Sequence, residues 1–156
     1  MVGIERLCKK KRGTMTYRFE FIGEPVAKGR PKICARGGFA RAYTPAKTRN
    51  AEAWIKMQTT NQLPKGFTIL QGPLVARIYF IRKYPKFLCL KNPQKQTEKR
   101  KGKYPITKPD LDNLIKTILD AMNGLVFEDD NQIVALYAEK KYGEEGKTVV
   151  ELMGSH

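Results

Sequence analysis

The sequence predicts an α+β domain, with a mixed or antiparallel sheet and two main helices on one face. Three observations support this fold class: segments in which apolar and polar residues alternate, segments with helical spacing of apolar residues, and glycine or proline between them. The chain has 156 residues, enough for one hydrophobic core but too few for two independent catalytic domains. We therefore expect a flexible basic extension over residues 1–14 and one domain over residues 15–153.

The first strand and a hairpin are expected early in the domain. Residues 16–26 alternate so that Tyr17, Phe19 and Phe21 lie on one side of an extended backbone. A glycine pair in the middle of residues 33–43 predicts a tight turn, because glycine reaches positive φ without a steric clash.

A helix and a second strand follow. Residues 44–61 are predicted to be helical, with Pro45 suited to the first turn. We assign Trp54 to the core, where an aromatic residue in a helical apolar pattern usually lies, and stacking on a nucleic-acid base is the alternative. Residues 74–81 alternate and predict a central strand.

The charge of the chain indicates a polyanionic partner. The net charge is +15, from 30 Lys and Arg against 15 Asp and Glu, and nucleic acid is the leading candidate. No run approaches the roughly 20 apolar residues of a membrane-spanning helix. The three cysteines are odd in number and share no CxxC spacing, which argues against a disulfide framework or a zinc site and fits a reducing cytoplasm.

Basic residues also suggest where DNA would bind. A segment at about residues 83–107 is strongly basic and lacks an apolar period, so we predict a mobile loop. It could fold over bound DNA or serve only as a solubilising insertion, and the basic residues before the hairpin could equally be a solvated loop. The candidates for contacts with the DNA backbone are Lys28, Arg30, Lys32, Arg36, Arg41, Lys99, Arg100 and Lys101.

The clearest helical pattern lies in residues 111–122. Its apolar residues recur at helical spacing, and the helix is expected to end near Gly124. On another face Asp112, Lys116 and Asp120 follow one another at intervals of four, which forms a polar row along the helix.

Six carboxylates gather in and around this helix, within a basic chain. The acids are Asp110, Asp112, Asp120, Glu128, Asp129 and Asp130. Asp110 and Asp112 can converge at the helix start, and the strand that follows could return Asp130. Clustered carboxylates repel by about 4 kcal/mol per close pair at an effective dielectric of 20, and a divalent cation removes this cost. All-oxygen ligands favour Mg²⁺ or Mn²⁺ over zinc, and Lys116 beside them suits phosphodiester hydrolysis.

Each acid also has a structural explanation. Thr107 and Asp110 have capping-box spacing, Asp112 and Lys116 form an i,i+4 ion pair, and acids are common in turns. A non-catalytic DNA-binding or architectural protein therefore remains an alternative to a nuclease. A general nuclease for branched DNA is a third possibility.

The acidic segment resembles a known family. The pattern D-x-D-N-x-x-K stands at residues 110–116, and Asp129-Asp130-Asn131-Gln132 follows after the expected helix. In these motifs the chain is similar to the RusA family of Holliday junction resolvases, which are endodeoxyribonucleases of bacteria and their phages or prophages. The specific match covers about residues 108–142. The chain departs from better-known members in its long basic loop, and in Lys108-Pro109 where arginines often stand.

The resemblance implies roles for individual residues. Asp110, Asp112 and Asp130 correspond to metal-binding carboxylates, Asp129 to a neighbouring acid and Lys116 to a catalytic lysine. It further implies Mg²⁺ as cofactor, with Mn²⁺ as a substitute, and a four-way DNA junction as substrate. A homodimer would cut two opposing strands, in the cytoplasm of a bacterial or phage-infected cell.

Overall fold

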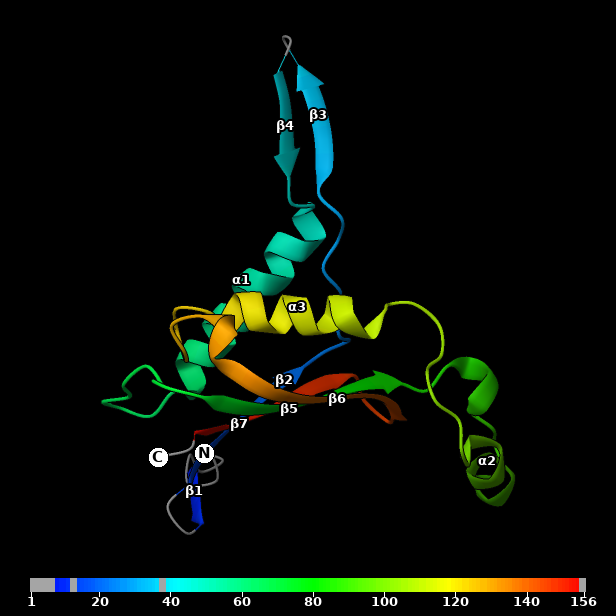
Figure 1. Cartoon of the computed structure of the whole chain (residues 1–156). Helices are drawn as coiled ribbons and strands as arrows, with labels where there is room; N and C mark the ends of the chain where they lie inside the picture. Colours follow the sequence, from blue (N-terminus) through cyan, green and yellow to red (C-terminus); the bar gives the residue numbers. More distant parts are fainter. Residues whose placement is uncertain (1–7, 12–13, 37–38, 155–156) are drawn as a thin grey trace.

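The computed structural model describes residues 8–11, 14–36 and 39–154 of the chain (Figure 1). Its larger sheet has five strands in the order β1-β2-β7-β5-β6. β5 and β6 run parallel, whereas the other neighbouring strands are antiparallel, so the sheet is mixed. The strands are β1 (Cys8–Lys11), β2 (Thr14–Ile22), β5 (Leu74–Lys83), β6 (Ile133–Gly143) and β7 (Lys147–Gly154).

Two long helices lie over the same face of this sheet. They are α1 (Ala46–Gln62) and α3 (Leu111–Met122), which also contact each other (Figure 1). The predicted α+β fold, with two main helices on one face of a mixed sheet, is confirmed. Shorter helical segments are η2 (Lys86–Leu88), α2 (Pro93–Arg100) and η3 (Asp130–Gln132).

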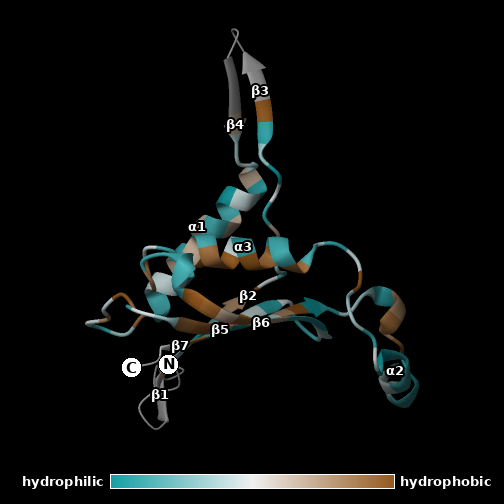
Figure 2. Cartoon of the chain, viewed as in Figure 1, coloured by the Kyte–Doolittle hydropathy of each residue, from teal (hydrophilic) through white to brown (hydrophobic). Residues whose placement is uncertain are grey.

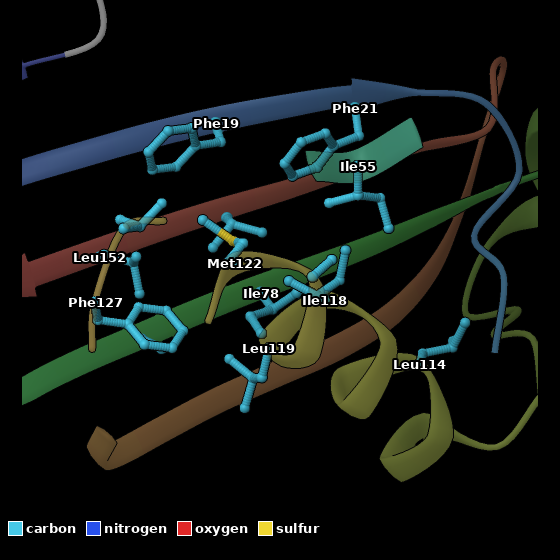
Figure 3. Packing of buried hydrophobic residues seen from close by; sticks show 14 of the residues in the cluster. Phe19, Phe21, Ile55, Ile78, Leu114, Ile118, Leu119, Met122, Phe127 and Leu152 are labelled. Atoms are coloured by element: carbon cyan, nitrogen blue, oxygen red, sulfur yellow. The ribbon is translucent and has the colours of Figure 1, made fainter. Parts of the chain in front are cut away.

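The hydrophobic core lies between α3 and the sheet (Figure 3). Phe19 and Phe21, predicted on one side of the first strand, are both buried, as are alternate residues of β5. Leu114, Ile118 and Met122 are buried on α3, whose hydrophobic side is turned toward the sheet in Figure 2. Burial of such a side chain contributes about 1.5–3 kcal/mol. The apolar stripe of α3 therefore fixes how its polar residues are presented.

The N-terminal extension is partly structured. Residues 8–11 lie within the predicted flexible extension, yet they form β1 and pair antiparallel with β2. The backbone partners that β2 provides explain why a basic run adopts a strand here. Residues 1–7 and 12–13 lie outside the described residues.

The predicted hairpin is present. β3 (Lys32–Arg36) and β4 (Phe39–Tyr43) pair antiparallel and project away from the sheet beside the start of α1 (Figure 1). The two glycines predicted to form its turn lie outside the described residues.

The segment at 83–107 has more structure than its composition predicted. It contains η2 and α2, and Leu88 is only 1% exposed. Arg100 donates from Nε to the carbonyl of Leu88 at 3.2 Å. The prediction of a segment without regular structure was wrong, because one buried leucine and the contacts of one arginine supply packing that a window of composition does not show. Its mobility over DNA stays a prediction.

Trp54 also lies elsewhere than predicted. The helix around it is confirmed, but Ile55 takes the core position and Trp54 remains 37% exposed. Its ring packs edge-on against Phe21, with centroids 6.3 Å apart. The prediction that Trp54 belongs to the core was wrong, because Ile55, the next residue of α1, points into the core in its place.

Candidate active site at the start of helix α3

Asp110 occupies the position immediately before α3. Its backbone is extended, and its carbonyl accepts the first helical hydrogen bond from Leu114 at 3.2 Å. Among the described residues, no main-chain N–H of α3 is capped by the Asp110 side chain. The capping explanation for this acid is therefore not observed, and its exposed carboxylate is available to a ligand.

The chain leading to Asp110 is held by two basic side chains of the sheet. Lys140 of β6 donates from Nζ to the carbonyls of Thr107 and Pro109, at 3.1 and 2.9 Å. Arg82 of β5 donates from Nη1 to the carbonyl of Lys108 at 3.0 Å. These bonds tie the start of α3 to the ends of two parallel strands and fix where Asp110 lies.

Asp110 lines a basic cleft of about 820 Å³. We use the name basic cleft for the space bordered by Asp110 and Asn113 of the motif and by four basic side chains. Those four are Arg30, Lys47, Arg82 and Lys108. Glu24 also lines the cleft, so two carboxylates lie among several cations, an arrangement suited to a metal ion beside a phosphate.

Only part of this cleft was predicted. Arg30 was a candidate for backbone contact, whereas Lys47, Arg82 and Lys108 were missed. Lys47 lies in the first turn of α1 and Arg82 near the end of β5. Nothing in their local sequence separates them from other basic residues, because only the fold brings the three segments together.

Asp112 and Lys116 form a pair on the exposed side of α3. The distance from Lys116 Nζ to Asp112 Oδ2 is 3.3 Å, and both side chains are more than half exposed. The i,i+4 ion pair considered from the sequence is therefore present. Neither residue lines the basic cleft, although both lie within two turns of Asp110.

Lys28 contacts acids of the helices. Its Nζ is hydrogen-bonded to Asp120 Oδ2 and lies 4.0 Å from Glu52 Oε1. The hydrogen bond to Asp120 raises the pKa of Lys28. The backbone N–H of Lys28 also donates to the carbonyl of Asn113 at 2.9 Å. Lys28 thus anchors the segment before the hairpin onto α3, and this use competes with its predicted contact to a phosphate.

Asp129 and Asp130 lie beyond the other end of α3. Asp129 caps η3: its carboxylate accepts a hydrogen bond from the backbone N–H of Asn131 at 2.9 Å. This is the structural explanation that the sequence analysis gave for acids in a turn. Asp130 is exposed. Partial desolvation raises the pKa of Asp130, and the charges of Asp129 and Asp120 raise it further.

One chain does not gather the predicted metal ligands. The carboxylates that act on Asp130 belong to Asp129 and Asp120, and Asp120 is eight positions after Asp112, about 12 Å along a helix. Across residues 8–11, 14–36 and 39–154, no three acidic, histidine or cysteine side chains come close enough to hold a metal ion. The expectation that Asp130 meets Asp110 and Asp112 within one chain was wrong, because α3 holds them at opposite ends.

The remaining DNA-contact candidates divide into three groups. Lys32, Lys99 and Lys101 are exposed. Arg100 is engaged: it stacks on Tyr84 and its Nη1 lies 2.5 Å from Glu144 Oε1. The side chains of Arg36 and Arg41 lie outside the described part of the hairpin.

Comparison with known proteins gives a clear result. The family model of the endodeoxyribonuclease RusA matches residues 23–153. The chain belongs to the RusA family. This confirms the resemblance inferred from the acidic motifs, and membership of this family implies a nuclease that acts on branched DNA with a divalent metal.

Two curated relatives cover nearly the same length as this RusA-family chain. An uncharacterized protein of Bacillus subtilis (strain 168), YqaN, is 34% identical over 133 residues, covering 85% of this chain and 92% of the relative. A crossover junction endodeoxyribonuclease, rusA of Lactococcus phage r1t, is 28% identical over 137 residues, covering 87% and 95%.

Within the described residues of this RusA-family protein, no helix is both long enough and apolar enough to span a bilayer.

Proposed function

We propose that this protein is a Mg²⁺-dependent endodeoxyribonuclease that resolves Holliday junctions by paired hydrolysis of DNA phosphodiesters in recombination and repair. The observation that carries the proposal concerns Asp110, the first residue of the D-x-D-N-x-x-K motif. Its carboxylate makes no capping hydrogen bond to α3 and borders the basic cleft. Such a cleft suits a phosphate next to a hard cation.

The donor set fits the metal that the family implies. Asp110, Asp112 and Asp130 would supply the carboxylate oxygens, with Asp129 beside them, and hard cations prefer such ligands. Bound Mg²⁺, or Mn²⁺ in its place, would polarise the phosphate and lower the pKa of a water molecule. Lys116 would offset negative charge on the phosphate, while Arg30 and Arg82 would hold the DNA backbone in the cleft.

A homodimer is part of the proposal. β6 is an edge strand, and Val134, Leu136 and Tyr137 on it are all substantially exposed. An apolar edge strand is a ready site for association. A two-fold dimer would also match the two-fold symmetry of a four-way junction, with one incision on each of two opposing strands.

The dimer offers a way to complete the metal site. Asp130 opens η3, which leads directly into the exposed edge strand β6, and Asp110 and Asp112 lie at the opposite end of α3. A two-fold axis near β6 would carry Asp130 of one protomer toward Asp110 and Asp112 of its partner. We propose that each site draws carboxylates from both protomers.

The test is cleavage of a labelled four-way junction, with Mg²⁺ or with EDTA. Wild-type protein should cut in Mg²⁺ and bind without cutting in EDTA. Asp112→Asn should lower the cleavage rate by about 100-fold or more while binding is kept or tightened, because the lost charge weakens the metal site and reduces repulsion of phosphate.

Glu128→Gln is the matched control. Glu128 is an exposed acid of the same segment, outside the family motif, and accepts a hydrogen bond from Gln71 at 2.9 Å. The Glu128→Gln variant should cut the junction at the wild-type rate. Binding without any cutting by the wild type would identify a DNA-binding or architectural protein instead. Flaps and forks cut as fast as junctions would identify a general branched-DNA nuclease.

A further inference from the structure

A second cavity, of about 660 Å³, lies against α1. Its wall combines aromatic residues of the sheet and of α1, Phe21, Phe80 and Trp54, with the aliphatic side chain of Ile118 from α3. The volume falls within the roughly 300–1,000 Å³ that is usual for pockets binding small organic groups. We refer to it as the Trp54 cavity.

Trp54 gives this cavity an exposed aromatic wall. Its side chain is 37% exposed although the ring packs edge-on against Phe21, with an interplanar angle of 63°. An indole fixed by one neighbour and open on another side is available for stacking with a planar ligand. Asn50, one turn earlier in α1, lines the same cavity and is exposed. Its amide carries both donors and an acceptor.

The Trp54 cavity adjoins the basic cleft. Both are bordered by Glu24, Pro25, Val26 and Lys47. On one side of this shared wall lies Asp110 with its surrounding cations, and on the other side lie the aromatic rings. A ligand with an anionic part and a flat apolar part would therefore find both environments across one wall, and a nucleotide has this composition.

We propose that the Trp54 cavity receives an unstacked nucleobase of the DNA strand whose backbone lies in the basic cleft. The inference rests on the proposed function, and it adds a base-binding site to the phosphate-binding one. The base stacks on Trp54, Asn50 hydrogen-bonds its polar edge, and Lys47 at the shared wall binds the adjacent phosphate. Strands at the crossing point of a junction offer bases that are cheaper to unstack than those inside a duplex.

The test compares an intact four-way junction with junctions lacking one base, moved position by position around the crossing point. Binding is measured by anisotropy of a labelled arm, with EDTA present so that no cutting occurs. One abasic position should weaken wild-type binding about ten-fold, the loss expected for one stacked base. Since Trp54 is the only tryptophan, its fluorescence should be quenched more by the intact junction than by this abasic one.

Two variants assign the effect to the cavity. Trp54→Ala removes the stacking wall, and Ala51→Leu fills the cavity while leaving the indole in place. Both should bind the intact junction about ten-fold more weakly and lose the discrimination against the abasic one. Met57→Ala, on the exposed side of the same helix, should behave like wild type. Circular dichroism checks folding, and Ala51→Leu decides the outcome if Trp54→Ala is unfolded.

The outcomes separate this inference from the nuclease assignment. If wild type ignores every abasic position, or if the folded cavity variants still discriminate, the base site is overturned even when Mg²⁺-dependent cutting is intact. If wild type discriminates through Trp54 and never cuts, the base site stands and the nuclease proposal fails. Loss of self-association in Trp54→Ala would mark the cavity as a contact between protomers and would also overturn the inference.

Discussion

The guanidinium of Arg100 lies over the ring of Tyr84, with its Cζ atom 3.7 Å from the ring centre. Tyr84 in turn stacks on Tyr142, at a centroid distance of 5.5 Å, and Arg100 also pairs with Glu144. A single arginine thereby joins α2 to residues at the ends of β5 and β6. The basic segment is attached to the sheet at this point, which a solvated loop would not be.

Arg100→Ala should therefore release α2 while the core stays folded. The side chain of Arg100 is only 13% exposed, so its stacking and hydrogen bonds stabilise this segment locally. We expect trypsin to cleave between residues 86 and 103 several-fold faster, with little change in the midpoint of thermal unfolding. Lys99→Ala removes a neighbouring exposed charge and is the control. If trypsin cleaved the Arg100→Ala and Lys99→Ala variants at the same rate, the anchoring role of Arg100 would be contradicted.

The exposed lysines of α2 lead to a different prediction. If α2 closes over DNA, Lys99 and Lys101 neutralise phosphates and release counterions. The double variant Lys99→Ala/Lys101→Ala should reduce the slope of log K against log salt concentration by about one to two, with similar losses for every DNA sequence. Binding isotherms at several salt concentrations measure this slope. An unchanged slope would exclude these lysines from the DNA surface.

Sequence periodicity was a good guide to the elements that build the core. One side of β2 and one side of α3 are buried, so their apolar residues recur with the period of a strand or of a helix. This period can be read from each segment alone, as it was for Phe19 and Phe21. Trp54 and the segment at about 83–107 were misjudged because their environments are set by distant segments. Trp54 is 37% exposed while Ile55 beside it is buried, and Arg100 hydrogen-bonds the carbonyl of the buried Leu88.

The candidate site was predictable as a motif but not as a geometry. The sequence places Asp110 just before α3, Asp112 in its first turn and Lys116 one turn later, and the structure agrees. The distance to Asp130 depends on where the chain re-enters the sheet after α3, which no local pattern specifies. Arg82 and Lys108 joined the site only through tertiary contact.

Asp120 provides a test of how far the polar row of α3 takes part in catalysis. It stands at the same spacing from Lys116 as Asp112 does, yet it pairs with Lys28 and lies outside the family motif. We expect Asp120→Asn to retain cutting within a few-fold of wild type. Since the pair with Lys28 is about one-third exposed, the free energy of unfolding should fall by less than about 1 kcal/mol.

Junction cleavage and thermal unfolding of Asp120→Asn should be measured beside Asp112→Asn. A loss of cutting as large as that of Asp112→Asn, with unchanged stability, would show that Asp120 belongs to the metal site. In that case Asp120 and Asp130 would act together at the second end of α3, where the charge of Asp120 already reaches Asp130.

The separation of Asp130 from Asp112 makes a test with mixed dimers decisive. Asp112→Asn and Asp130→Asn are each expected to be inactive alone. If every site takes Asp112 from one protomer and Asp130 from its partner, a mixed dimer has one site with both changes and one intact site. Co-expression with two different tags, followed by sequential purification, isolates this dimer. It should nick one strand of a junction but should not give paired incision.

The matched control is a mixed dimer of Asp110→Asn with Asp112→Asn. Asp110 and Asp112 come from the same end of α3 and reach the same site. Each site of this control dimer therefore keeps one substituted ligand and stays inactive. Sites built within single protomers would leave both mixed dimers inactive, since each protomer carries its own defect. Nicking by the first mixed dimer and none by the control would therefore show that two chains share each metal site. It would also explain why the described part of a single chain holds no cluster of three ligands.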